Sequence, residues 1–338
     1  MTVVATAKNG KVPADTLRVF EAAGPFLGEL EQFFEDQKVE FEPELQELVE
    51  YAITHSGKRL RPIALYLSSA NSDRQIPKRL VQAAAVVELV HLATLVHDDI
   101  LDHADLRHES ETVARRFGVS AAVLLGDALF AQALQLASRF ETTEVCRLVS
   151  EATRKICAGE IEQSLDGQEP KDEIERYFRI IERKTAVLFE ASCRLGAYLG
   201  SPGAALAPIA GDFGRHMGIA YQIYDDLVDV IGSEANVGKT LGTDLASGKR
   251  TLPLILLKRK LSREGQHPDD LANAEIADLM LQEEIVSEVE AYFAREMEKA
   301  ESAADVIPSG RKGSRLSDVA TFLRGRFDLL LAEATVRL

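Results

Sequence analysis

The 338-residue chain has no tryptophan, only three cysteines and no excess of basic residues, and each shortage excludes a class of protein. Its formal net charge of −15 leaves no broad basic surface for nucleic-acid phosphates. Cys146, Cys157 and Cys193 form no CxxC pair and lie in helix-like segments, which favours buried thiols in a reducing compartment over disulfides. We therefore expect a cytoplasmic protein that binds no nucleic acid.

Long apolar runs are also scarce. The longest, residues 80–96, is interrupted by polar residues, and we expect it to be the central helix of a bundle rather than a membrane span. Residues 1–14 lack the apolar segment of a signal peptide and are expected to form a loose leader. The length would allow two domains, but residues 15–338 contain no internal repeat and fit one large helical domain.

Apolar residues recur with helical spacing along the chain, and no long stretch alternates with period two. Pro43 and Pro77 fit the first turns of helices. The expected helices cover 15–55 (in two parts), the segment after 62, the segment after 77, 119–139, 143–166, 172–200, 204–232, 253–262, 270–303 and 315–336. This pattern predicts an all-α bundle with a cavity between its core helices.

The central apolar helix is expected to end in three aspartates, Asp98, Asp99 and Asp102. Positions four and seven apart share a helix face, so His91, Asp98 and Asp102 form one stripe, with Glu88 a turn earlier. In apolar surroundings these like charges are costly unless a cation compensates them. Converging carboxylates without a cation among them suggest Mg²⁺, which takes one or two carboxylates plus substrate phosphates. For a single cluster, a solvated helix end remains the alternative.

A second DDxxD motif argues against that alternative. Asp225, Asp226 and Asp229 repeat the spacing in apolar surroundings, and Gln222 shares the face of Asp225 and Asp229. Two helices that each carry such a motif predict two sides of one site for metal ions and diphosphate. Asp127, in the next apolar helix, is either a satisfied core aspartate or a group that supports the metal ligands.

An acidic protein with an anionic substrate needs basic residues at its site. The segment GKRLRP contains Lys58 and Arg61, and the glycine-rich segment 232–251 contains Lys239 and Lys249, which we expect to reach the site from a flap. The glycine-rich segment resembles a nucleotide-binding P-loop, but five residues rather than four separate its key glycines, and a helix precedes it. We therefore reject ATP or GTP binding there.

Taken in order, the motifs GKRLRP, HDDILD, LLGDALF, ERKTAVLF, YQIYDDLVD and GKTLGTDLASGKRTLP resemble the trans-isoprenyl diphosphate synthase (polyprenyl synthetase) family over nearly the whole chain. The resemblance implies an isoprenoid synthase-type bundle of antiparallel helices around a central cavity, usually in a homodimer. It implies a prenyltransferase that joins an allylic diphosphate to isopentenyl diphosphate, with three Mg²⁺ ions per site.

The resemblance assigns roles to the polar residues of these motifs. The Mg²⁺ ligands would be Asp98, Asp102 and Asp225, assisted by Asp99, Asp226 and Asp229. The allylic substrate would contact Arg107, Lys184, Thr185, Gln222 and Lys239, with Lys249 nearby. The diphosphate of isopentenyl diphosphate would contact Lys58, Arg61 and His91. Catalysis would depend on the six aspartates together with Lys184 and Gln222.

Two positions bear on substrate binding and product length. The family pattern RRGxPT is RHESET here, so that His108 replaces an arginine that the family uses for isopentenyl diphosphate, and a neutral imidazole is a poorer phosphate partner. Ala93 and Thr94 lie before the first aspartate, where the family's short-chain members carry bulky aromatic residues. Small residues there imply all-trans products of geranylgeranyl length or longer.

Two alternatives to a chain-elongating synthase remain at this point. One is a class I terpene cyclase, which would normally lack the second DDxxD and the GKRLRP segment. The other is a non-catalytic partner subunit of a heteromeric prenyl synthase, which would tend to have degenerate aspartate motifs. Both motifs are intact here.

Overall fold

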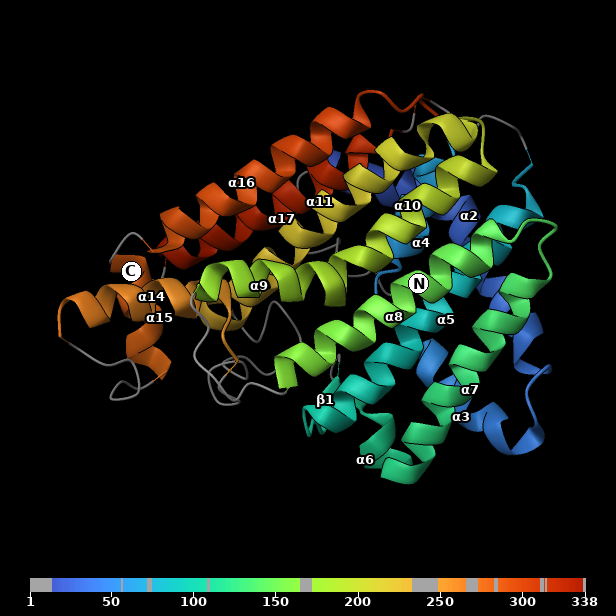
Figure 1. The fold of residues 1–338 in the computed structure, drawn as a ribbon, viewed down its shortest axis with the longest axis horizontal. Coiled ribbons are helices and arrows are strands. Elements are labelled where there is room, and N and C mark those ends of the chain that lie inside the picture. The colour runs from blue at the N-terminus through green and yellow to red at the C-terminus, as the bar shows by residue number, and fades with distance from the viewer. Residues whose placement is uncertain are drawn as a thin grey trace.

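The computed structural model describes residues 14–336, except 56, 72–74, 108–109, 165–171, 233–248, 266–272, 283–284, 311–312 and 314. Nearly all regular structure in this described part is helical, which confirms the expected all-α class (Figure 1). Its strands are limited to a two-residue antiparallel pair, β1 (Leu106–Arg107) and β2 (Ser110–Glu111).

The helices follow the expected segments closely. They are α2 (Ala14–Lys38), α3 (Pro43–Thr54), α4 (Leu60–Ser68), α5 (Lys78–Leu101), α6 (Val113–Phe117), α7 (Val119–Ser138), α8 (Glu144–Ser164), α9 (Glu173–Ile181), α10 (Val187–Leu199), α11 (Gly203–Ile231), α14 (Leu252–Arg263), α15 (Asn273–Gln282), α16 (Ile285–Ala304) and α17 (Ser317–Val336). Between α9 and α10 lies η2 (Glu182–Ala186), a π-helical turn that helical periodicity did not predict. The short α6 was also not expected.

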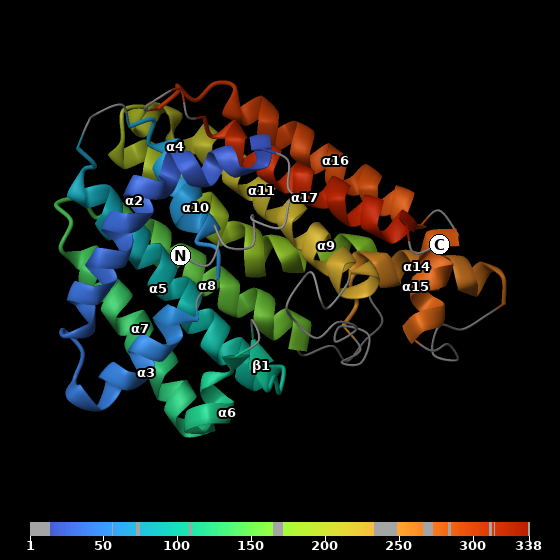
Figure 2. The ribbon, with the colours of Figure 1, turned by 180° about the vertical axis from the view of Figure 1, so that it is seen from behind.

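Two long helices organise the bundle. α5 packs against α2, α4 and α7, whereas α11 packs against α10, α16 and α17. In both views α16 and α17 run alongside α11, and α5 lies on the other side of the molecule next to α7 (Figures 1 and 2). α10 contacts both α5 and α11 and so joins the two halves. Each DDxxD motif therefore lies on the central helix of one half.

The core position of α5 explains why its residues are apolar on every face. By length and composition α5 could cross a membrane, but most of it is buried inside the protein, as expected for a core helix. Glu88, a charged residue buried in the middle of α5, receives a 2.8 Å hydrogen bond from Arg59, which is also buried. Removing one partner of such a buried pair typically costs about 3–5 kcal/mol. Glu88 thus anchors the chain before α4 and is not part of the acidic stripe at the end of α5.

α7 is the second helix that is long and apolar enough to cross a membrane, and less of it is buried. Its exposed large apolar residues are Val119, Val123, Leu124 and Leu134. Ile161 on the neighbouring α8 is also exposed. These five side chains make up most of the strongly exposed large hydrophobic residues among those described. The outer side of α7 is therefore an apolar face without a partner inside the described chain.

Candidate active site

Both acidic motifs lie at the carboxyl ends of their helices. Asp98 and Asp99 are in the last turn of α5 and Asp102 follows it directly, while the second motif occupies the last turns of α11. The carboxyl end of a helix carries partial negative charge, so an aspartate there is disfavoured by about 0.3–1 kcal/mol unless a cation is near. The two motifs therefore concentrate negative charge where the backbone already opposes it.

In the first motif each aspartate has a basic partner. Arg107 donates to Asp99 Oδ1 at 2.7 and 2.8 Å, and Lys249 Nζ lies 2.9 Å from Asp102 Oδ2. Lys184 Nζ lies 3.8 Å from Asp98 Oδ2. The expectation that these carboxylates lack a protein cation is therefore wrong, because Lys184 and Lys249 come from distant segments. All three basic residues are among those expected to hold the allylic substrate.

Asp98 has an unusual protonation equilibrium. Burial raises the pKa of its carboxyl to about 6, against the stabilising charge of Lys184, and the nearby Glu160 and Asp102 raise it further. A half-buried carboxylate with a raised pKa is held in a place where its negative charge is poorly compensated. Such perturbed groups cluster at functional sites, and Asp98 is the strongest candidate in this motif.

Lys184 is held by two residues that sequence reasoning missed. Its ammonium group contacts the carboxylate of Glu160 and donates to Gln163 Oε1 at 3.2 Å. Both residues lie on α8, one turn apart, and α8 approaches η2 closely at Gly159, where an added Cβ would lie 2.9 Å from Arg183 Cβ. A glycine followed by a carboxylate on an amphipathic helix is a weak signal, and only the tertiary contact gives it meaning.

The second motif has a different set of partners. Asp226 and Asp229 are both buried. Tyr177, on α9, donates to Asp226 Oδ2 at 2.7 Å, and Gln222 Nε2 donates to Asp226 Oδ1 at 2.7 Å. The Thr185 hydroxyl then donates to Gln222 Oε1 at 2.8 Å. Tyr177 is another residue that the sequence did not single out.

The π-helical turn brings the two motifs together. Two consecutive residues of η2 point to opposite motifs, since Lys184 lies beside Asp98 whereas Thr185 bonds to Gln222. π-helical turns are rare in proteins, and those that occur often lie at functional sites. The prediction that the two DDxxD helices form two sides of one site thus acquires a physical link, although that link is made by η2 rather than by metal ligands in direct contact.

A third group of residues lies between α4, α5 and α10. An N–H of Arg61 donates to His91 Nε2 at 2.9 Å, and the Arg61 guanidinium lies 4.5 Å from the centre of the Phe189 ring. The pKa of Lys58 is lowered to about 8, mainly because the surrounding protein removes water from the ammonium group and secondly because Arg326 repels its charge. Asp225 acts in the opposite direction, and the residue as a whole is exposed. The sequence placed Lys58, Arg61 and His91 together, and the last two are in direct contact.

Comparison with known proteins identifies the family. Residues 42–289 match the sequence model of the family described as Polyprenyl synthetase. This chain belongs to the polyprenyl synthetase family. It is 32% identical to the "Heptaprenyl diphosphate synthase component 2" of Bacillus subtilis over 293 residues, which cover 84% of this chain and 83% of that protein.

Two further relatives in the polyprenyl synthetase family extend this finding. The "Octaprenyl diphosphate synthase" of Escherichia coli is 34% identical over 235 residues, covering 70% of this chain and 71% of that protein. A solved structure, a polyprenyl synthase from Caulobacter crescentus complexed with calcium and isoprenyl diphosphate, superposes with a TM-score of 0.79 at 26% identity, covering 96% of this chain and 99% of that one. The expected prenyltransferase class and helical fold are thereby confirmed.

Some residues expected from sequence need separate comment within this family assignment. Asp127 is exposed and lies 3.8 Å from Nε2 of His97, the residue before Asp98, so the alternative of a satisfied core aspartate is wrong. Ala93 is fully buried, while Thr94 is half-buried and donates to the backbone carbonyl of His91 at 2.7 Å. The expected contacts of His108 and Lys239 lie outside the described residues.

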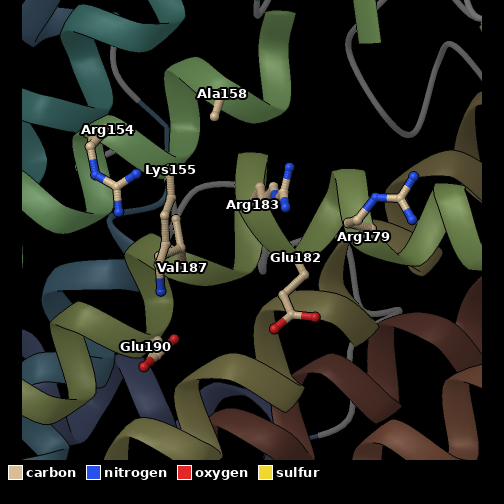
Figure 3. Close-up of a pocket in the computed structure, with 8 residues that line it drawn as sticks. All are labelled: Arg154, Lys155, Ala158, Arg179, Glu182, Arg183, Val187 and Glu190. Carbon is tan, nitrogen blue, oxygen red and sulfur yellow. The ribbon is translucent and has the colours of Figure 1, made fainter. Parts of the chain in front are cut away.

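A separate cavity of about 430 Å³ lies on the other side of η2, between α8, α9 and α10 (Figure 3). It contains none of the expected site residues. Two of its arginines, Arg179 and Arg183, bind Glu162 at 2.8 and 2.9 Å, and Glu182 accepts from Arg215 at 2.7 Å. Three of the charged residues that line the cavity therefore already have partners, and the remaining ones, Arg154, Lys155 and Glu190, are of both signs.

The donor set of the two motifs suits one kind of metal. Among the described residues, no three His, Cys, Asp or Glu side chains converge closely enough to hold an ion alone. The motifs offer only hard carboxylate oxygens at negative helix ends, with Asp98 poorly compensated by the protein. This fits Mg²⁺, which is commonly bound by one or two carboxylates and completed by substrate phosphates and water.

Proposed function

We propose that this chain condenses an allylic diphosphate with isopentenyl diphosphate to give a longer all-trans polyprenyl diphosphate and diphosphate. One observation carries the proposal: consecutive residues of η2, Lys184 and Thr185, lie against the two different DDxxD helices. A cation for the leaving diphosphate and an oxygen for the reacting carbon are thereby placed side by side. The family relationship and the intact motifs support the same reaction.

The reaction needs binding and charge stabilisation more than proton transfer by a side chain. Arg107, Lys184 and Lys249 would hold the allylic diphosphate while its C–O bond breaks and the bonding electrons leave with the diphosphate. Mg²⁺, held by Asp98, Asp102 and Asp225 and numbering three per site, would supply further neutralisation of that charge.

The remaining steps involve the allylic cation and the second substrate. Thr185 and Gln222 would turn oxygen dipoles toward the cation in a pocket that excludes water. Lys58, Arg61 and His91 would hold isopentenyl diphosphate so that its double bond attacks. The proton released from the new chain would pass to the departing diphosphate, so no side-chain general base is required.

Product length is proposed to be geranylgeranyl or longer. The small side chains of Ala93 and Thr94 lie one turn before Asp98, where a growing chain directed along α5 would pass. Thr94 retains exposed surface and Ala93 does not, so a bulky residue at 94 should obstruct such a channel directly, while one at 93 must first displace packed neighbours.

The test of function is an incubation with labelled isopentenyl diphosphate and allylic primers of several lengths, with the products sized by chromatography. Wild type should extend the primer to 20 carbons or more, and Thr94→Phe and Ala93→Phe should shorten the main product to about farnesyl size. Wild-type products no longer than farnesyl, or unchanged lengths in both variants, would contradict the proposed channel. Release of a hydrocarbon or alcohol would instead indicate a terpene cyclase.

A non-catalytic role as partner subunit is the second candidate, because one relative is named as a component of its synthase. The intact aspartate motifs favour a catalytic subunit. Turnover by the purified chain alone would exclude the non-catalytic role, whereas activity that appears only with a second protein of different sequence would support it.

We also propose that the chain works as a cytoplasmic homodimer. The apolar face of α7 offers a surface for a second copy, and monomeric proteins rarely leave large apolar patches open to water. Sedimentation velocity should therefore give twice the chain mass of 37.1 kDa. A monomer at micromolar concentration would contradict the dimer.

A further inference from the structure

We propose that Tyr177 is a positioning residue that orients Gln222 and Thr185 toward the reacting carbon by way of Asp226. This proposal rests on the proposed roles of Gln222 and Thr185 in stabilising the allylic cation. It concerns a residue that lies on α9, outside both DDxxD motifs, and it assigns Asp226 a function that differs from metal binding.

The contacts form a continuous chain across three elements. Tyr177 of α9 donates to Asp226 of α11 at 2.7 Å, Gln222 donates to the other oxygen of Asp226 at 2.7 Å, and Thr185 of η2 donates to Gln222 at 2.8 Å. Tyr177, Asp226 and Thr185 are all buried. Side chains linked in this way hold one another in a single arrangement, because each bond restricts the rotation of the next group.

The carboxylate fixes the direction of every bond in this chain. An ionised carboxylate can only accept hydrogen bonds, so Gln222 must turn its amide nitrogen toward Asp226. The amide oxygen of Gln222 then faces Thr185 and must accept the hydroxyl proton. Since a hydroxyl has one proton, Thr185 has only lone pairs left for its other side. A threonine that offers lone pairs rather than a proton is the form that can stabilise a positive carbon.

Tyr177 stabilises this arrangement from the far end. Its hydroxyl occupies Asp226 Oδ2, which leaves Oδ1 to hold the amide of Gln222. The position of the tyrosine is itself well defined, because its ring packs edge-on against Phe178 at 5.3 Å and Asp172 caps the start of α9. Without the hydroxyl, the carboxylate could turn and the amide could reverse, which would point a proton of Thr185 toward the substrate.

The test is Tyr177→Phe, which keeps the ring and removes only the hydroxyl. We expect kcat, and the single-turnover rate with pre-bound allylic diphosphate, to fall about tenfold, as for other residues that orient a group in direct contact with substrate. The KM for isopentenyl diphosphate and the Mg²⁺ concentration for half-maximal rate should not change. The matched control is Tyr292→Phe. The Tyr292 ring also packs against Phe178, with 5.4 Å between the ring centres, so this variant removes a hydroxyl from the same aromatic cluster.

A double-mutant comparison identifies the route of the effect. Gln222→Met removes the amide through which Tyr177 is proposed to act, so Tyr177→Phe should cause little additional loss in that background. Unchanged kcat in Tyr177→Phe, full additivity with Gln222→Met, or recovery at higher Mg²⁺ concentration would each overturn the proposal. A wild-type protein without prenyl transfer would instead overturn the proposed function, so the two failures are distinguishable.

Discussion

The aspartates at the end of α5 and those at the end of α11 share one sequence spacing but have different surroundings. At α5 each aspartate has an arginine or a lysine as a partner, and Asp102 is exposed. At α11 the described partners of Asp226 are a tyrosine hydroxyl and an amide, and the carboxylate is buried. Equal spacing therefore gives one motif whose aspartates pair with charged side chains and one whose middle residue, Asp226, accepts hydrogen bonds from uncharged side chains.

This contrast separates two tasks that a DDxxD motif can perform. Ion pairs near the surface contribute little stability, typically about 0–1 kcal/mol, and are easily replaced by other charges. Buried hydrogen bonds to a carboxylate are costly to break and hold geometry. The exposed pair of Asp102 with Lys249 in the first motif is therefore suited to exchanging partners when ligands bind, and the second motif to holding Gln222 and Thr185 in place.

The largest expected effect tests whether both motifs serve one reaction. Asp98→Ala and Asp225→Ala should each lower kcat about 1,000-fold, on the order of 4 kcal/mol of transition-state stabilisation, because each removes a proposed metal ligand. Circular dichroism should show that both variants remain folded. A variant of either motif that kept more than a tenth of wild-type turnover at saturating Mg²⁺ would show that its helix does not contribute to the site.

The next effect concerns stability and should separate the motifs. Asp226→Ala leaves two donors without their acceptor in the core, so the free energy of unfolding should fall by about 2–4 kcal/mol. Asp102→Ala breaks only an accessible ion pair with Lys249 and should cost less than about 1 kcal/mol. Urea denaturation without ligands measures both values. Equal losses in the two variants would remove the proposed difference between the motifs.

The smallest effect is a gain in stability. The pKa of Asp98, about 6 against an ordinary value of 3.8, means that its ionised form destabilises the folded protein above pH 6 and that this destabilisation disappears below about pH 4. In metal-free protein, Asp98→Asn should therefore raise the free energy of unfolding by about 1–3 kcal/mol at pH 8, and by progressively less toward pH 4. A variant that is less stable than wild type at pH 8 would contradict this account.

Local patterns were enough to predict most of the helices and to single out several of the charged residues that the structure brings together. The spacing of Asp98 and Asp102 at the end of α5, and the helix start at Pro43, are properties of short segments, and the structure has the helices that they predict. Arg61 lies in contact with His91. The prediction that Glu88 belongs to the acidic stripe of α5 was wrong. Because α5 is buried on all sides, a position on the same helix face does not determine which neighbour a residue contacts, and Glu88 contacts Arg59.

Partners from distant segments could not be predicted in this way. Tyr177 reaches Asp226 across 49 positions, and Glu160 reaches Lys184 from another helix. Nothing in the sequence around Tyr177 or Glu160 distinguishes them from ordinary residues of amphipathic helices. Their significance depends on how closely α8, α9 and α11 pack, which is a property of the whole fold.

The π-helical turn has a consequence for how α9 and α10 fit against α11. On one side of η2, Tyr177 sets the register of α9 through its bond to Asp226. On the other side, α10 meets α11 so closely that an added Cβ at Gly214 would lie 2.3 Å from the carbonyl oxygen of Phe189. Two contacts that are fixed along one continuous helical segment need not be separated by a whole number of α-helical turns. Because the π-helical turn at 182–186 is wider than an α-helical turn, deleting a single residue there would shift α9 against α10, and we expect one of the two attachments to open.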